Sequence, residues 1–361
     1  MRKLLLLLTP LLAFSLCVGV FTWSQHLRLH GEVREGEFAS ADGVVLAGSL
    51  LVPRASGEGP YPVIILLHGS GAAAGLPPFV TAHANALLRE GVAVLAYDKR
   101  GSGRSGGELA EATYADFIED ALAALRFVRT LDDVDDSRVA VFGSSESGWF
   151  TPEIAARDGA LRFIINRAGP PTNWMTTNLW EIRHELLAAG LDDEPTLATI
   201  AALRSDIWHY YREAARAKAP LPAQRDQLSR RLQEVDAQWL AVIGMRLAAY
   251  DQARFERYAA DIFYDPSPYL ERLDVPLLVF FASDDQNVPT RLAVRTLTHL
   301  RDAQEKRIEL HVFEGYRHGM ARWHNLFSLG YPPDYLPTMA AWARAQFASE
   351  SSRPAGPAPP R

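Results

Sequence analysis

The 361-residue chain contains a single cysteine, Cys17. One thiol excludes an intramolecular disulfide. Its position near the N-terminus also excludes a cysteine nucleophile or a cysteine-based metal site in the rest of the chain. With 48% hydrophobic residues, a chain of this length has enough apolar material to fold around its own core without cross-links.

The sequence also lacks an excess of positive charge. Lys and Arg number 37 against 43 Asp and Glu, which gives a net charge of −6, and no segment forms a basic stripe. Nucleic acid is therefore not an expected partner, because its phosphates require such a surface.

Long apolar runs are missing except at the N-terminus. Residues 4–23 carry no charge and follow Arg2 and Lys3. A basic start before such a run is typical of a secretory signal or an uncleaved anchor, and the run is long enough to span a bilayer. Both alternatives stay open for residues 1–25, including a membrane tether through residues 4–23. In either case we expect an extracytoplasmic protein that is secreted, periplasmic or anchored, since the positive charges stay inside.

Between residues 33 and 349, short apolar runs alternate with amphipathic stretches. Runs such as 61–69 (YPVIILLHG) are continuously apolar and end in turn residues, as strands buried on both faces do. Stretches such as 113–131 place apolar residues three and four apart, which predicts helices. Alternating strands and helices predict a parallel, doubly wound α/β sheet.

This alternation is interrupted once. After Gly169, residues 172–262 are polar-rich and helical in pattern, and strand patterns resume near Val275. We therefore expect a helical insertion in the α/β domain, not a separate unit with a sheet. The final residues, 350–361, are rich in Pro and Ser and are predicted to be disordered.

Three serines in the segment VFGSSESGWF (141–150) follow a predicted buried strand. A nucleophile in a sharp strand-to-helix turn needs small residues two positions before and after it. Ser145 has Gly143 and Ser147 there, whereas a phenylalanine and a glutamate flank Ser144 and a tryptophan follows Ser147. Ser145 is thus the candidate nucleophile, although Ser147 replaces the glycine of the usual G-x-S-x-G pattern. The alternative is an ordinary serine at a helix N-terminus.

A nucleophilic serine needs a general base and a group that orients the base. His318 follows the last predicted strand, at the edge where parallel strands end. By contrast, His311 alternates within that strand, His68 precedes a glycine-rich loop, and His324 lies in an aromatic stretch. His318 is therefore the candidate base.

Two glycine-rich loops follow earlier strands. In LLHGSGAAAG, the N–H of Ser70 (or of Gly71) is predicted to bind an oxyanion together with the N–H of Glu146, because glycine lets backbone donors approach a ligand. A plain glycine-rich turn is the alternative. The loop AYDKRGSGRSGG lacks the order of a phosphate-binding loop, and we interpret it as a rigid loop in which Asp98 and Arg100 hold the strand end.

These segments occur together in a known order. LLHGSG, YDKRGSGRSGG, GSSESG, SDDQNVP and FEGYRH resemble the motifs of the α/β-hydrolase superfamily over about residues 36–349. The chain is most similar to the dienelactone-hydrolase-like and prolyl-oligopeptidase-like serine esterases and peptidases. The resemblance implies a mostly parallel eight-stranded sheet with helices on both faces, with residues 172–262 at the position of the family's helical cap.

The resemblance also implies the triad Ser145, Asp285 and His318, because the family's chain order is serine, acid, histidine. Asp285 is preferred because Asp285-x-x-Val288-Pro289 is similar to the family's acid turn, and the adjacent Asp284 is the alternative. The implied reaction transfers an acyl group to water and needs no metal or cofactor.

The implied activity is that of a serine hydrolase acting on small carboxylic esters. A serine peptidase of the aminopeptidase or acyl-peptide type, acting on short peptides, is the alternative. A non-catalytic binding protein on the same fold is the third possibility, since fold does not fix function. Six aromatic residues of the insertion either line an apolar pocket or pack in its core: Trp174, Trp180, Trp208, Tyr210, Tyr211 and Trp239.

Overall fold

The computed structural model describes residues 28–54, 59–321 and 330–349. The predicted signal or anchor (1–25) and the predicted disordered tail (350–361) lie outside these ranges, and so does His324. No helix within the described ranges is both long and apolar enough to cross a bilayer.

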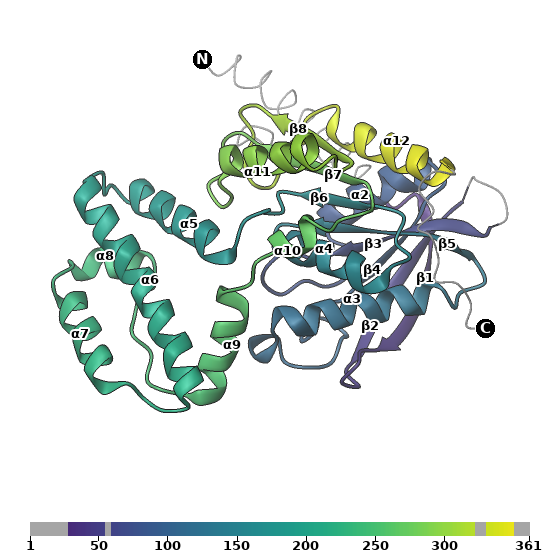
Figure 1. Ribbon diagram of the computed structural model, residues 1–361. Helices are drawn as coiled ribbons and strands as arrows, with labels where there is room; N and C mark the ends of the chain where they lie inside the picture. Colours follow the sequence, from purple (N-terminus) through teal and green to yellow (C-terminus); the bar gives the residue numbers. More distant parts are fainter. Residues whose placement is uncertain (1–27, 55–58, 322–329, 350–361) are drawn as a thin grey trace, which may run out of the picture.

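Eight strands form one sheet in the order β1-β2-β4-β3-β5-β6-β7-β8 (Figure 1). The strands from β4 to β8 in this order pair in parallel. The pairs β1–β2 and β2–β4 are antiparallel, so the sheet is mixed at one edge. The predicted α/β-hydrolase fold is confirmed. The strands are β1 (Gly31–Ala39), β2 (Val45–Pro53), β3 (Tyr61–Leu67), β4 (Ala93–Tyr97), β5 (Val134–Ser144), β6 (Ile164–Arg167), β7 (Leu277–Ala282) and β8 (Ile308–Phe313).

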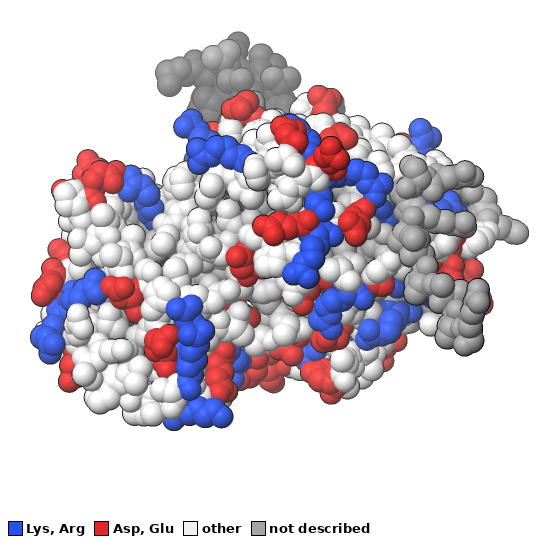
Figure 2. Space-filling view, viewed as in Figure 1, with Lys and Arg blue, Asp and Glu red and all other residues white. Residues whose placement is uncertain are grey.

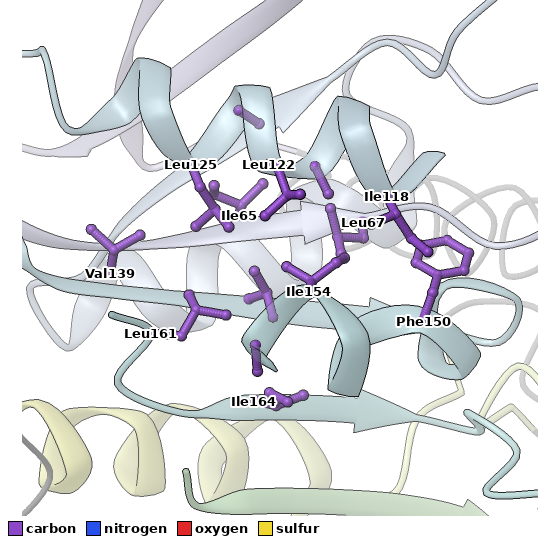
Figure 3. Close-up of a cluster of buried hydrophobic side chains, with 14 of the residues drawn as sticks. Ile65, Leu67, Ile118, Leu122, Leu125, Val139, Phe150, Ile154, Leu161 and Ile164 are labelled. Carbon is purple, nitrogen blue, oxygen red and sulfur yellow. The ribbon is translucent and has the colours of Figure 1, made fainter. Parts of the chain in front are cut away.

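The sheet separates two apolar cores, because successive side chains of a strand point to opposite faces. In β3, Ile65 and Leu67 face a core shared with α3 and α4 (Figure 3), and Ile64 and Leu66 face one shared with α2 and α12. Burial of one such side chain contributes about 1.5–3 kcal/mol, so an all-apolar β3 belongs in the middle of the sheet. The covering helices are α2 (Pro78–Arg89), η1 (Leu109–Glu111), α3 (Tyr114–Val128), α4 (Ser147–Asp158), α11 (Thr290–Ala303) and α12 (Tyr335–Ala348).

Residues 174–262, here called the helical block, form five helices between β6 and β7. Figure 1 shows the block as a lobe beside the sheet. It has its own core, in which the ring centroids of Tyr211 and Phe255 lie 4.4 Å apart. Tyr210 and Tyr211 are both buried there, so they pack in the core and do not line a pocket. The helices are α5 (Trp174–Ala188), α6 (Glu194–Ala217), α7 (Pro222–Gln233), α8 (Ala237–Val242) and α9 (Gln252–Ile262), followed by α10 (Ser267–Leu270).

The surface of the helical block carries acidic and basic side chains side by side (Figure 2). Some of them form ion pairs, as between Arg231 Nη1 and Asp206 Oδ2, 2.5 Å apart, and between Arg183 and Glu194. Exposed pairs of this kind contribute at most about 1 kcal/mol each. The block is therefore held together mainly by its apolar core.

Helix α9 joins the helical block to the start of α3. The N–H of Tyr114 donates a hydrogen bond of 2.9 Å to Asp261 Oδ1, and Arg257 Nη1 lies 2.6 Å from Glu111 Oε2. The pKa of Asp261 is raised to about 6, mainly by burial and in smaller part by the carboxylates of Glu146 and Asp116, while the hydrogen bond from the Tyr114 N–H opposes the rise. Above this pKa, the ionised carboxylate of Asp261 therefore lowers the stability of the folded protein at the contact between α9 and α3.

Asp261→Asn is expected to stabilise the protein at pH 8 and hardly at pH 4. A carboxyl group whose pKa is raised by folding favours the folded state at low pH, and this contribution is lost as the pH rises through about 6. Asparagine keeps an oxygen for the Tyr114 N–H but cannot ionise, so the free energy of unfolding should rise by roughly 1–3 kcal/mol at pH 8. Urea unfolding at both pH values measures this, and an equal change at both would contradict it.

Candidate active site

Ser145 occupies the sharp turn between β5 and α4. Its φ of 53° lies in the left-handed region, which non-glycine residues adopt at an energetic cost. Its N–H donates a hydrogen bond of 2.8 Å to the carbonyl oxygen of Arg167, at the end of the neighbouring strand β6. This backbone contact holds the strained turn in place.

The residues around Ser145 explain why its flanks are small. A Cβ placed on Gly143 would lie 2.6 Å from Asn166 Oδ1, so no side chain fits there. On the other flank, the hydroxyl of Ser147 accepts a hydrogen bond of 2.7 Å from the N–H of Ser144 and donates one of 3.2 Å to the carbonyl oxygen of Leu67. Ser147 therefore fits in place of the usual glycine and braces the turn.

The close approach that glycine usually permits at this turn is made one residue later. A Cβ on Gly148 would lie only 2.3 Å from the Cα of Gly169. The first turn of helix α4, which follows Ser145, thus packs directly on the backbone that follows β6.

The structure brings Ser145, His318 and Asp285 together from the ends of three strands. His318 Nε2 lies 2.8 Å from Ser145 Oγ, and His318 Nδ1 lies 2.8 Å from Asp285 Oδ2. A carboxylate only accepts hydrogen bonds, so Nδ1 carries the proton and Nε2 is left to accept from the serine hydroxyl. The arrangement can move the hydroxyl proton to the imidazole.

The alternative acid lies in a different environment. Asp285 is 3% exposed, and its Oδ1 also accepts hydrogen bonds from the N–H groups of Asn287 (2.8 Å) and Val288 (2.9 Å). Asp284 is exposed, and its Oδ1 accepts a hydrogen bond from the hydroxyl of Ser283. Of the two carboxylates, Asp285 contacts His318.

Arg167, at the end of β6, is a buried residue of the site that the sequence analysis missed. Its Nη2 donates a hydrogen bond of 2.5 Å to Ser144 Oγ, and its Nη1 donates one of 3.3 Å to the carbonyl oxygen of His318. Its guanidinium also lies over the ring of Phe79, 4.6 Å from the centroid. A charged residue two positions after the apolar run FII (163–165) was the available signal. Arg167 ties the serine turn to the histidine loop.

The two predicted oxyanion donors lie on loops that meet beside Ser145. A Cβ on Gly69 would lie 3.5 Å from Ser145 Cβ, so the loop after β3 passes next to the serine. Among the described residues, neither the N–H of Ser70 nor that of Glu146 donates to an acceptor. The alternative donor, Gly71, has a φ of 81° in the same loop. Two backbone donors are thus free to bind a ligand at this edge of the sheet.

The helical block contacts the acid turn through α5. Trp180 Nε1 donates a hydrogen bond of 3.3 Å to the carbonyl oxygen of Asp285, and Asn287 Nδ2 donates one of 2.7 Å to Glu181 Oε1. The start of the block therefore borders the site and supports the loop that carries the carboxylate.

The other candidate histidines have separate contacts. His68 Nε2 lies 2.5 Å from the carbonyl oxygen of Tyr97, and burial lowers the pKa of His68. His311 Nε2 lies 2.8 Å from Glu309 Oε1 on the same strand. No cluster of three or more His, Cys, Asp or Glu side chains within the described ranges is arranged to hold a metal ion.

Two surface cavities lie away from Ser145. One, of about 370 Å³, lies between α10 and α11, and the other, of about 540 Å³, lies at the end of β2 and the start of β3. Neither is bordered by the triad candidates. The candidate site lies instead at the carboxyl ends of the parallel strands, where ligands bind in open α/β sheets.

The comparisons with known proteins agree with this fold and with a serine hydrolase of the esterase or peptidase class. The family model of the X-Pro dipeptidyl-peptidases (S15 family) matches residues 42–318, more than half of the chain. The quorum-quenching protein AidA of Acinetobacter baumannii is 25% identical over 260 residues, which cover 71% of this chain and 80% of that protein. Esterase EstD of Thermotoga maritima is 35% identical over 120 residues, which cover 32% of this chain and 28% of that protein.

Solved structures share the fold at low identity. Esterase Pf2001 of Pyrococcus furiosus matches with a TM-score of 0.53 and 16% identity, covering 87% of this chain and 90% of that chain. The α/β hydrolase GrgF from Penicillium sp. sh18 matches with a TM-score of 0.56 and 18% identity, covering 88% and 100%. The chain belongs to the X-Pro dipeptidyl-peptidase (S15) family of α/β-hydrolases and is a serine hydrolase of the esterase or peptidase class.

Proposed function

We propose that the protein hydrolyses carboxylic esters through an acyl-enzyme formed on Ser145. The observation that carries this proposal is the continuous contact from Ser145 Oγ to His318 Nε2 and from His318 Nδ1 to Asp285 Oδ2, with 2.8 Å at each step. Serine, base and orienting acid in this relation activate a hydroxyl that is otherwise a weak nucleophile.

In the first half-reaction, Ser145 Oγ attacks the ester carbonyl carbon while its proton passes to His318 Nε2. The carbonyl oxygen becomes an oxyanion that the N–H groups of Ser70 and Glu146 bind. The intermediate then expels the alkoxide, which takes the proton from Nε2 and leaves as the alcohol. Asp285 holds the imidazole in the required tautomer and stabilises its charged form.

In the second half-reaction, water replaces the serine as nucleophile. It gives a proton to His318 Nε2 and attacks the acyl carbon, which re-forms the oxyanion in the same place. The intermediate then expels Ser145 Oγ, which takes the proton back. Each oxyanion donor typically contributes about 10²–10³ to turnover.

Peptide hydrolysis by the same groups is the second candidate. The match to the S15 family model favours it, since that family is described by its X-Pro dipeptidyl-peptidase activity. In this case the leaving group is an amine, which takes its proton from His318 Nε2. The acylation chemistry is otherwise unchanged.

A substrate panel distinguishes the two activities. We expect kcat/KM for p-nitrophenyl esters of short acyl chains to exceed that for X-Pro and aminoacyl p-nitroanilides by at least about 10²-fold, which corresponds to about 2.7 kcal/mol in the barrier. Steady-state kinetics of the purified full chain measure both. A higher kcat/KM for an X-Pro anilide would reverse the assignment in favour of the peptidase.

A further inference from the structure

A buried lysine lies behind the two loops that carry the oxyanion donors. Lys99 follows β4 and is 5% exposed. Its Nζ donates a hydrogen bond of 2.9 Å to the carbonyl oxygen of Gly69 and one of 2.5 Å to Glu146 Oε2, and it lies 4.2 Å from the centroid of the Phe117 ring. One ammonium group thus joins the loop after β3 to the residue that follows Ser145.

The bond to Gly69 acts on one of the predicted donors directly. The carbonyl of Gly69 and the N–H of Ser70 belong to the same trans peptide group, so they point in opposite directions. Fixing the carbonyl toward Lys99 therefore fixes the direction of the Ser70 N–H. The positively charged ammonium group that donates to the carbonyl oxygen also polarises the amide, which makes the N–H of Ser70 a stronger donor.

The bond to Glu146 acts on the other donor. The side chain of Glu146 is 14% exposed and turns back to Lys99, and the N–H of the same residue is free at the start of α4. Holding the side chain restricts the rotation of the backbone that carries this N–H. A single buried residue thus contacts both segments that carry the predicted donors.

We propose that Lys99 is a positioning residue that aligns the N–H groups of Ser70 and Glu146 for the oxyanion and polarises the former. The proposal rests on the function proposed above. A purely structural ion pair is the competing explanation, because a buried charge left without its partner costs about 3–5 kcal/mol in stability. The two explanations differ in what happens to the transition state of a protein that remains folded.

Lys99→Met tests this with Arg129→Met as the matched control. Arg129 forms another largely buried pair, with Nη1 2.6 Å from Asp158 Oδ1. Asp158 ends α4, roughly 16 Å along the helix from Ser147. Both variants are expected to unfold at a lower temperature than the wild type, but only Lys99→Met should lose catalysis.

The expected loss in Lys99→Met is about 10²-fold in kcat for a p-nitrophenyl ester, with KM changed less than about threefold. The inhibition constant of a boronic acid, whose adduct with serine resembles the tetrahedral intermediate, should rise by a similar factor. Arg129→Met should keep kcat and the inhibition constant within about twofold. Equal kcat in Lys99→Met and wild type at a temperature where both are folded would overturn the proposal.

The double variant Lys99→Met/Glu146→Gln removes a complication. In Lys99→Met the carboxylate of Glu146 is left without its partner, and its charge alone would repel an oxyanion. In the double variant the carboxylate charge is gone as well, and the Gly69 carbonyl is still without its donor. If the donor matters, kcat should therefore remain at least about 30-fold below wild type. Recovery to within threefold would assign the whole effect to the unpaired charge. If Lys99→Met does not fold, the double variant carries the comparison with Arg129→Met.

The rate of labelling by a fluorophosphonate separates failure of this inference from failure of the proposed function. The reagent needs the activated serine and the oxyanion donors but no particular substrate. Labelling of wild type with an unchanged rate in Lys99→Met would overturn the role of Lys99 alone. Absence of labelling in folded wild type would overturn the serine mechanism itself.

Discussion

Ser145→Ala is expected to abolish labelling by a fluorophosphonate probe and to lower ester turnover by at least about 10⁴-fold. The hydroxyl is the group that bonds to the acyl carbon, and the hydroxyls of the adjacent Ser144 and Ser147 have other partners. The N–H that stabilises the turn stays in alanine, and the small side chain tolerates the same backbone as serine. In-gel labelling and steady-state kinetics measure the two effects, with thermal unfolding to show that the variant is folded.

The neighbouring serines supply the controls. Ser144 Oγ accepts a hydrogen bond from Arg167, and Ser147 Oγ is bonded within the turn, so neither hydroxyl contacts His318. Ser144→Ala and Ser147→Ala should therefore keep the labelled site, although each loses a buried hydrogen bond and about 1–3 kcal/mol of stability. Loss of labelling in folded Ser144→Ala, with labelling kept in Ser145→Ala, would move the nucleophile by one residue.

The sequence was sufficient to predict the fold because its strongest signals are local. Continuous apolar runs such as that of β3 predict strands buried on both faces, and glycines and prolines mark where they end. Because parallel strands end at the same edge of the sheet, Ser145, Asp285 and His318, which each follow a strand, come to that edge. The steric argument for Ser145 also depended only on the residues two positions away.

Contacts across the sheet could not be predicted in this way. Ser147 in place of a glycine was a departure in the sequence, and its fit depends on the carbonyl of Leu67 from β3, far away in the chain. The same holds for Arg167 and Lys99, whose partners lie on three different loops. Each is a charged residue at or just after a strand end. The sequence shows such residues but does not show which other residues they contact. The predicted roles of Ser70 and Glu146 remain predictions.

Asp285→Asn is expected to lower turnover by about 10⁴-fold, and Asp284→Asn by less than about threefold. The reason lies in the bonds that Asp285 already makes. Its Oδ1 accepts from the N–H groups of Asn287 and Val288, so an asparagine places its own oxygen there to keep both bonds. The amide NH₂ then takes the position of Oδ2, facing His318 Nδ1.

A donor at this position reverses the tautomer of the base. His318 Nδ1 has to accept from the NH₂, so its proton moves to Nε2, the atom that receives the proton of Ser145. The change has little reason to unfold the protein, because asparagine keeps the size and the backbone contacts of the aspartate. Asp284 is exposed and does not contact the imidazole, so Asp284→Asn is the control on the adjacent position. Steady-state kcat of the two variants, measured at equal folded fraction, decides between the two carboxylates. A loss confined to Asp284→Asn would shift the acid by one residue. Full activity of both variants would place the orienting group elsewhere in the chain.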